Sequence, residues 1–357
     1  MTKLLLLLLF ASASAFAQDC KEQNLVTEAN SPFQKIPVYD QNGSDTCYAF
    51  TGAQMADYHL IKKGAKTRSI HPAWVALQTA RRWFNDSLTN GSSAIKSLVS
   101  LERFQNCSYD NVAQGLAAWA KKANVTESEI LNLIEKYSPV IRELSTEKGA
   151  LAEADYRYAL EVALEEHRSC SANPTWAQLL PLLSELKLLS SPDMLAKLLL
   201  PACENGQQPV SLPKAKYEYL ADEAAIASKL ASKLEKLKSP VALTYCANLW
   251  SNPDYKGVIA RGPSAPTVLQ TCGQHASVVV GKKMIAGTCH FLVRNSWGKE
   301  FNSFNEKWTC LCKNRSTGAF VDNCTASMNA NKQFDVEGCW IKADAISKNA
   351  SDLTTLE

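Results

Sequence analysis

A single cysteine, Cys47, stands between a turn-rich stretch, "QNGSDT", and a helix-like stretch, "YAFTGAQMADYHLIKK". The second stretch contains no proline, and its apolar residues can share one buried face. A helix that begins at Cys47 places the sulfur at the positive end of the helix dipole, where the thiolate is favoured and the thiol pKa is lowered. Cys47 is therefore either a structural cysteine, buried or disulfide-bonded, or a nucleophile with a depressed pKa.

A cysteine nucleophile needs a base, a group that orients the base, and donors for the developing oxyanion. The chain has five histidines, so the base can be sought by elimination. His59 lies too far along the expected helix, and His71 stands before a proline. His167 lies in a charged helical segment, and His290 lies inside a strand-like run. His275 remains, at the head of the strand-like run "HASVVVG".

The run that begins at His275 is followed by a second one, "HFLVRNSWG", after the basic, glycine-flanked segment 281–287. This arrangement predicts an antiparallel hairpin with its turn at 281–287. Alternation along the second run places Phe291, Val293 and Asn295 on one face. Asn295 can then reach His275 across the pair, and Trp297 can shield this hydrogen bond from water.

The stretches "DQNGSDTCYAF", "CGQHASVVVG" and "VRNSWG", in this order, resemble the papain-type cysteine peptidases. The resemblance implies that Cys47 is the nucleophile and His275 the base and acid. It also implies that Gln41 is the oxyanion-hole donor and that Asn295 orients His275. Gln41 precedes Cys47 by six positions, which is the family's spacing.

The nucleophile region departs from the family signature C-G-[SA]-C-[WY]. Ser44 stands in place of the first cysteine, so the family's disulfide at this point cannot form. Asp45 adds a negative charge two residues before Cys47, which we expect to raise the thiol pKa.

The resemblance also implies substrate contacts outside the reacting groups. Gly91 and Ser92 are expected to meet the substrate backbone, with an ordinary loop and helix cap as the alternative. Tyr245, within the strand 241–249, and Trp297 are expected to shape the substrate side of the cleft, with simple strand packing as the alternative for Tyr245. Within the same strand, Thr244 and Cys246 are candidates for the same role.

The fold implied by the resemblance is α+β, a papain-like two-lobed fold with a helical lobe and an antiparallel β-barrel-like lobe. Cys47 lies 228 positions before His275 (275 minus 47), against roughly 130 to 150 in the family. The predicted organisation is a signal peptide at 1–17, an N-terminal segment and helical lobe at 18–109, a helical insertion at 110–210, and the β lobe at 211–357. The insertion is either a cap that restricts the cleft or a buttress on the far side.

Residues 1–17 read as a secretory signal, with one lysine, an apolar run and the small-residue ending Ala15-Phe16-Ala17. The mature chain is therefore predicted to be secreted or periplasmic, with no membrane span after cleavage. All twelve cysteines lie beyond this segment, and most should form disulfides in an oxidising compartment. If Cys47 is free, eleven remain, so one more must be free or pair with another molecule.

A zinc site is the alternative for four cysteines near the C-terminus, and disulfides are the preferred interpretation: Cys310, Cys312, Cys324 and Cys339. No metal and no cofactor is expected. A possible glycosylation sequon, 42–44, lies inside the active-site loop, where a glycan would obstruct substrate. This favours a bacterial protein.

Loss of the signal lowers the net charge from +3 to +2, which argues against a nucleic-acid or phosphate-binding protein. The expected partner is a protein or peptide substrate. The sequence thus predicts an exported cysteine peptidase that acts through a Cys47 acyl-enzyme. The alternatives are an inactive papain-like binding protein, and a thiol acyltransferase or amidase with a non-peptide substrate.

Overall fold

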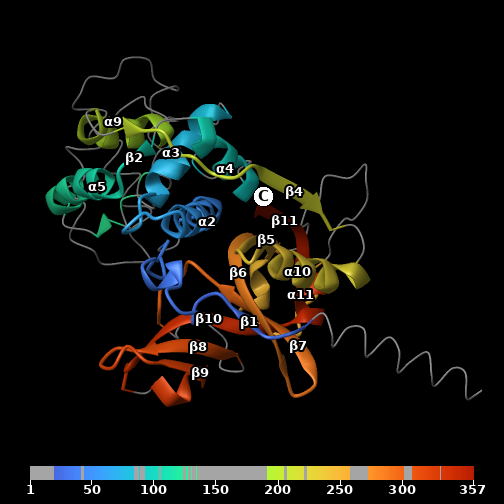
Figure 1. Ribbon diagram of the computed structural model, residues 1–357. Helices are drawn as coiled ribbons and strands as arrows, with labels where there is room; N and C mark the ends of the chain where they lie inside the picture. The colour runs from blue at the N-terminus through green and yellow to red at the C-terminus, as the bar shows by residue number, and fades with distance from the viewer. Residues whose placement is uncertain are drawn as a thin grey trace, which may run out of the picture.

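A computed structural model gives the arrangement of the chain (Figure 1). It describes residues 20–41, 44–83, 88, 93–103, 106–123, 126–127, 130, 134, 191–204, 207–220, 223–257, 272–300, 308–329 and 331–357. The expected signal, the sequon residues 42 and 43, and most of 124–190 lie outside the described residues.

Within the described residues, the helical lobe contains five helices: α2 (Cys47–Lys62), α3 (Pro72–Arg82), α4 (Ala94–Arg103), α5 (Tyr109–Ala123) and α9 (Ser191–Cys203). α2 begins at Cys47, as the sequence predicts. α3 begins at Pro72, where the proline occupies the first helical turn and the His71 ring accepts a hydrogen bond from Ala73 N–H. α2 packs against α3 and α4 on one side and against the sheet on the other.

The sheet lobe contains nine antiparallel strands within the described residues, ordered β4-β11-β5-β6-β7-β10-β8-β9, with β1 paired to β6. Their bounds are β1 (Gln23–Asn24), β4 (Ala215–Tyr219), β5 (Val241–Cys246), β6 (Gln274–Ile285), β7 (Thr288–Arg294), β8 (Thr309–Asn314), β9 (Phe320–Cys324), β10 (Phe334–Lys342) and β11 (Ala350–Leu356). Helices α10 (Glu223–Leu237) and α11 (Ala343–Asn349) pack together beside the sheet, and short 3-10 turns lie at η1 (Pro32–Gln34), η3 (Ala247–Leu249) and η5 (Ser327–Asn329). The α+β class, with helices joined to an antiparallel sheet, is confirmed.

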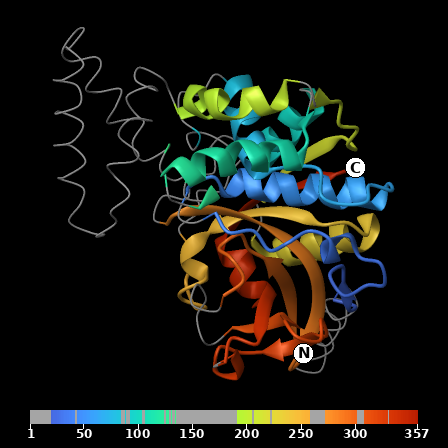
Figure 2. The same ribbon diagram turned by 90° about the vertical axis from the view of Figure 1, so that its left-hand side faces the viewer.

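The central strands are buried on both faces, because helices lie on each side of them. Ala242, Val278 and Leu292 face the helical lobe. Their neighbours along the same strands, such as Leu243 and Val279, face α10 and α11. Figure 2 shows the result as layers, with the helices of the helical lobe stacked over the sheet. α2 is thus held between two apolar layers, and its first residue lies over β6.

The hairpin of β6 and β7 forms, but its turn lies later than expected. β6 continues through 281–285, and the chain reverses at Ala286 and Gly287, which have φ angles of 48° and 76°. A pair of residues with positive φ is the geometry of a tight two-residue hairpin turn. The glycine expected to open the turn, Gly281, instead lies within β6 at a register shift. A residue with a side chain does not fit there, because its Cβ would meet the Gln23 carbonyl oxygen at 2.7 Å.

The described parts of the region 110–210 are mostly helical, and their helices belong to the helical lobe. α9 packs against α3 and α5 (Figure 1), and side chains such as Leu116 and Leu195 join the same core as α2. The two ends of this excursion are tied together by the disulfide Cys107–Cys203 and by pairing of β2 (Asn106–Cys107) with β3 (Gln207–Gln208). The domain boundaries and a capping role stay predictions.

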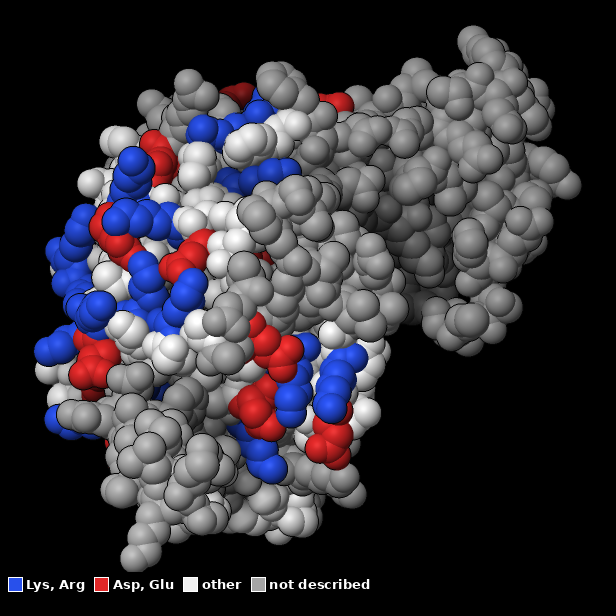
Figure 3. Space-filling model, turned by 90° about the vertical axis from the view of Figure 1, so that its right-hand side faces the viewer, with Lys and Arg blue, Asp and Glu red and all other residues white. Residues whose placement is uncertain are grey.

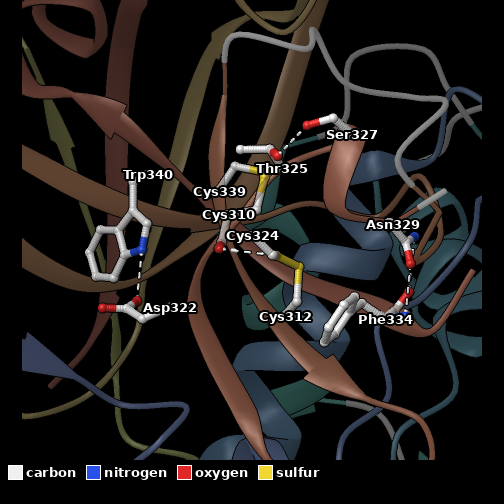
Figure 4. Close-up of a disulfide and its surroundings, with 10 residues drawn as sticks. All are labelled: Cys310, Cys312, Asp322, Cys324, Thr325, Ser327, Asn329, Phe334, Cys339 and Trp340. Atoms are coloured by element: carbon white, nitrogen blue, oxygen red, sulfur yellow. Dashed lines mark hydrogen bonds between the residues drawn. A yellow bond between two sulfur atoms is a disulfide. The ribbon is translucent and has the colours of Figure 1, made fainter. Parts of the chain in front are cut away.

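Five disulfides pair ten of the eleven cysteines other than Cys47: Cys20–Cys289, Cys107–Cys203, Cys246–Cys272, Cys310–Cys339 and Cys312–Cys324. The eleventh, Cys170, lies outside the described residues. Figure 4 shows the two C-terminal bridges, which join β8 to β10 and β8 to β9. The four thiols considered for zinc are therefore disulfide-bonded, and the preferred interpretation is confirmed.

The surface carries both signs of charge. Basic and acidic side chains lie interspersed on the face shown in Figure 3. Several form ion pairs, such as Lys229 with Glu218 and Lys233 with Glu357. Among the described residues, no helix combines the length and apolar character that crossing a bilayer requires.

The Cys107–Cys203 bridge should contribute more stability than the shorter C-terminal one. It closes a separation of 96 residues, against 12 for Cys312–Cys324, and all four cysteines are fully buried. Chain-entropy arguments give about 4.7 kcal/mol for a loop of about 100 residues and about 3 kcal/mol for one of about 15. We predict that replacing Cys107 and Cys203 with serine lowers the denaturation midpoint more than replacing Cys312 and Cys324 does. An equal or smaller loss would contradict this loop-closure argument.

Candidate active site

A cavity of about 370 Å³ lies where the start of α2 meets β5 and β6. It brings together three of the residues that the sequence analysis selected for chemistry: Gln41, Cys47 and His275. The other described lining residues are Asp45, Tyr48, Ser93, Thr244, Gly273, Gln274 and Ala276.

Cys47 is the free cysteine of the described residues and is partly exposed at the start of α2. Burial of the sulfur raises its pKa to about 11, although the backbone N–H groups of Ala276 and Tyr48 favour the thiolate. The negative charge of Asp45 raises the pKa further, as expected from the sequence. The predicted depressed pKa is therefore wrong for the unliganded protein, because desolvation of the sulfur outweighs the helix N-terminus.

His275 and Asn295 form the expected pair, with His275 Nε2 and Asn295 Oδ1 2.6 Å apart. The same oxygen accepts a hydrogen bond from the backbone N–H of Ser296 at 2.7 Å. Since a backbone N–H can only donate, that atom of Asn295 must be the oxygen, and His275 Nε2 must carry the proton. His275 Nδ1 is then the unprotonated nitrogen that can accept a proton from a thiol.

The His275 ring is enclosed by aromatic side chains. The ring of Trp297 lies with its centroid 4.8 Å away, and the ring of Tyr245 lies edge-on at 5.6 Å. Burial lowers the pKa of His275 to about 4, and the bond to Asn295 only partly opposes this effect. The imidazole is therefore a neutral base at neutral pH.

Gln41 is held from both ends of its amide. Its oxygen accepts a hydrogen bond from Ser296 Oγ at 2.7 Å, and its nitrogen donates to the Ser44 carbonyl at 2.5 Å. An amide nitrogen carries two N–H groups, so one remains for the cavity that Gln41 lines. The N–H of Cys47 is in the first turn of α2, where helical N–H groups lack an intrahelical acceptor. These two donors can hold a negatively charged oxygen.

Backbone pairing ties the Gln41 segment to the segment after Asn295. Gln41 N–H donates to the Ser296 carbonyl at 2.8 Å, and Gly298 N–H donates to the Tyr39 carbonyl at 2.9 Å. Gly298 has a φ of 79°, and a Cβ there would come within 3.0 Å of the Asp40 carboxylate. The glycine of "NSWG" is thus favoured by its positive φ, at a point where the two lobes lie close together.

Ser44, three residues before Cys47, takes a local structural role. Its hydroxyl donates to the Gln41 carbonyl at 2.8 Å and lies 2.8 Å from Thr46 Oγ1. These bonds tie Ser44 to Gln41 and to Thr46 without a disulfide.

The expected substrate contacts are placed as follows. Gly91 and Ser92 lie outside the described residues. Trp297 is partly exposed and covers His275. Tyr245 is 1% exposed and lies behind His275, whereas its neighbour Thr244 lines the cavity.

Sequence reasoning did not select Ser296, whose hydroxyl holds Gln41, or Ser277, whose hydroxyl lies 3.3 Å from Asn295 Oδ1. For Ser277 there was a signal in the sequence. It is a polar residue two positions after His275 in an apolar strand, and alternation places both on one face.

No protein-family model and no curated protein matches this chain. Solved structures do resemble it at low identity. Xylellain, a cysteine protease from Xylella fastidiosa, is 14% identical, with 94% of this chain and 85% of that chain covered and a TM-score of 0.42. A cysteine protease from Carica candamarcensis in complex with E-64 is 12% identical, with 92% and 96% covered and a TM-score of 0.37. Because these scores are low, we draw the function from the site geometry.

The pKa values of the site predict how Cys47 reacts with iodoacetamide. Below about pH 11 the thiol is neutral in the unliganded protein, and the thiolate is the reactive form. We therefore expect the alkylation rate of Cys47 to rise with pH from 5 toward 11, followed by mass spectrometry of the labelled peptide. Asp45→Asn should move this profile to lower pH. A rate that is already constant between pH 5 and 8 would instead show a thiolate–imidazolium pair at rest.

Proposed function

We propose that this protein is a papain-type cysteine peptidase that hydrolyses peptide bonds through a Cys47 acyl-enzyme. The observation that carries the proposal is the hydrogen bond from His275 to Asn295, which determines which ring nitrogen of the neutral imidazole carries the proton. Asn295 holds the proton on Nε2, so Nδ1 is a proton acceptor, and His275 lines the same cavity as the free thiol of Cys47. A buried structural cysteine would need no such base.

In the first half of the reaction, the sulfur of Cys47 attacks the substrate carbonyl carbon while its proton moves to His275 Nδ1. The carbonyl oxygen becomes negative and is held by the Cys47 N–H and the Gln41 amide. The C–N bond then breaks, the amine leaves with the proton from His275, and a thioester on Cys47 remains. Because His275 begins neutral, it can take the proton as the sulfur attacks.

In the second half, water replaces the amine. His275 Nδ1 takes a proton from the water, whose oxygen attacks the thioester carbon. The same two donors hold the oxyanion. The C–S bond breaks, the acid product leaves, and the proton returns to the sulfur of Cys47.

Two other functions use the same fold. An inactive binding protein would not need the ordered His275 tautomer, and a peptidyl epoxide would not label its Cys47. An acyltransferase or amidase would be labelled but would not cleave peptides, so substrate profiling separates it from a peptidase.

We also propose that the protein is exported, to the periplasm or the medium. Five disulfides support an oxidising compartment, since such bridges are rare in the cytoplasm. Cleavage after Ala17 would be detected by N-terminal sequencing of the mature protein.

Substitution of the reacting groups should rank their roles. We expect Cys47→Ala and His275→Ala to abolish peptide hydrolysis while the thermal midpoint stays close to that of the parent. Gln41→Ala should reduce kcat by about 10² to 10³, as for loss of one oxyanion donor. Asn295→Ala should have a smaller effect because Asn295 orients the base and does not react. Full activity in Gln41→Ala would refute the oxyanion assignment.

Asp45 gives the cavity a charge preference. It is exposed, and it is the one acidic or basic side chain among the described lining residues apart from His275. A cationic side chain near the scissile bond would pair with Asp45. It would also neutralise the negative charge that raises the Cys47 pKa. We therefore propose a preference for arginine or lysine in this part of the substrate.

This preference can be measured with two peptides that differ at one position only, where one peptide has arginine and the other has glutamine. Asp45→Asn should reduce the arginine-to-glutamine ratio of kcat/KM by roughly two- to fivefold, as expected for an exposed ion pair. Glu28→Gln, which removes an exposed charge outside the cavity lining, should leave the ratio unchanged. If the two variants give the same ratio, Asp45 does not select the substrate.

A further inference from the structure

A row of buried polar groups leads from Trp250 to Asn295 behind the His275 ring. Trp250 Nε1 lies 2.6 Å from Tyr245 Oη, which lies 2.8 Å from Ser277 Oγ. Ser277 Oγ lies 3.3 Å from Asn295 Oδ1. We refer to Trp250, Tyr245 and Ser277 as the hydroxyl relay.

Chemistry fixes the direction of these hydrogen bonds. The indole N–H of Trp250 can only donate, so Tyr245 Oη accepts from it and has its own proton left to donate to Ser277. Asn295 Oδ1 can only accept, so Ser277 donates to it. Every proton therefore points toward Asn295, and each buried hydroxyl both accepts and donates.

The strand pattern explains why these side chains meet. Tyr245 of β5 is the register partner of His275 in β6, and Ser277 is two residues beyond His275 on the same face. Tyr245, Ser277 and Asn295 are all buried, at 2% exposure or less. Water therefore cannot easily replace a lost hydroxyl in the relay.

The amide nitrogen of Asn295 does not fix the orientation of this side chain. Its Nδ2 is buried and has no hydrogen-bond partner within the described part of the chain. The amide is consequently oriented by the donors on its oxygen, which are Ser277, His275 and the Ser296 N–H. A rotated amide would present Nδ2 to His275 and would favour the tautomer with the proton on Nδ1.

We infer that the hydroxyl relay acts together with the Ser296 N–H to hold the tautomer of His275 through Asn295, so that Tyr245 and Ser277 are positioning residues of the reaction. The inference rests on the proposed function for its catalytic consequence only. The orientation of Asn295 and the tautomer of His275 are properties of the protein itself and can be measured without substrate.

The direct test is imidazole ¹⁵N NMR of the full chain labelled at histidine, in a Cys47→Ala background that removes the titrating thiol. The His275 signals are assigned by their loss in His275→Gln. We expect the parent to show the Nε2–H tautomer and Ser277→Ala to show a measurable share of Nδ1–H. Tyr245→Phe should shift in the same direction but less, since the Ser277 hydroxyl is still present to donate.

Two matched variants control for loss of a buried hydroxyl elsewhere. Tyr58→Phe removes a bond to the Lys238 carbonyl, and Ser100→Ala removes a bond to the Lys96 carbonyl. Both should keep the parent tautomer. If Ser277→Ala does not fold, Tyr245→Phe carries the test, since it removes a single oxygen.

With Cys47 restored, Ser277→Ala should lower kcat by roughly five- to tenfold with little change in KM, which corresponds to the loss of one buried hydrogen bond. A tautomer unchanged from the parent in both Ser277→Ala and Tyr245→Phe overturns the inference whatever the kinetics show. If the parent cleaves no peptide, the proposed function fails, while the NMR result still decides the role of the relay.

Discussion

The hydrogen bond between His275 and Asn295 is the interaction on which the rest of the site depends. It is short, at 2.6 Å, and both side chains are buried. Its two residues come from the start of β6 and from the position just after β7, so the register of one hairpin sets their separation. The bond fixes which nitrogen of His275 is free, and this decides whether Cys47 has a base.

Burial has opposite consequences for Cys47 and His275, the two groups that we propose react. Enclosure by Trp297 and Tyr245 keeps His275 neutral, which suits a base. The same exclusion of water disfavours the thiolate of Cys47, and the start of α2 does not compensate. Burial thus favours the neutral thiol of Cys47 and the neutral imidazole of His275. In the reaction that we propose, proton transfer is therefore coupled to substrate attack, and substrate charge near Asp45 influences it.

The two lobes are joined beside the candidate active site. The segment 39–41 pairs with 296–298, so Gln41 from one lobe is aligned with Asn295 from the other. The long excursion between the lobes is closed at its base by Cys107–Cys203 and by β2 and β3. Its described helices, α5 and α9, extend the core of the helical lobe. The segment between Cys107 and Cys203 therefore leaves unchanged the pairing of 39–41 with 296–298.

By itself, the sequence determined the residue types, their order and the local elements. A proline-free stretch after Cys47 and the two-residue period of the strand that leads to Asn295 were enough to predict the start of α2 and the His275–Asn295 pair, because both depend on short-range periodicity. The pairing of Cys310 and Cys312 with separate partners, Cys339 and Cys324, depends on strand register, as does the turn of the hairpin at Ala286 and Gly287. Only the tertiary structure decided the pKa of Cys47, since desolvation comes from atoms distant in sequence. It also decided the contact of Tyr245, whose hydroxyl meets Ser277 only when β5 lies beside β6.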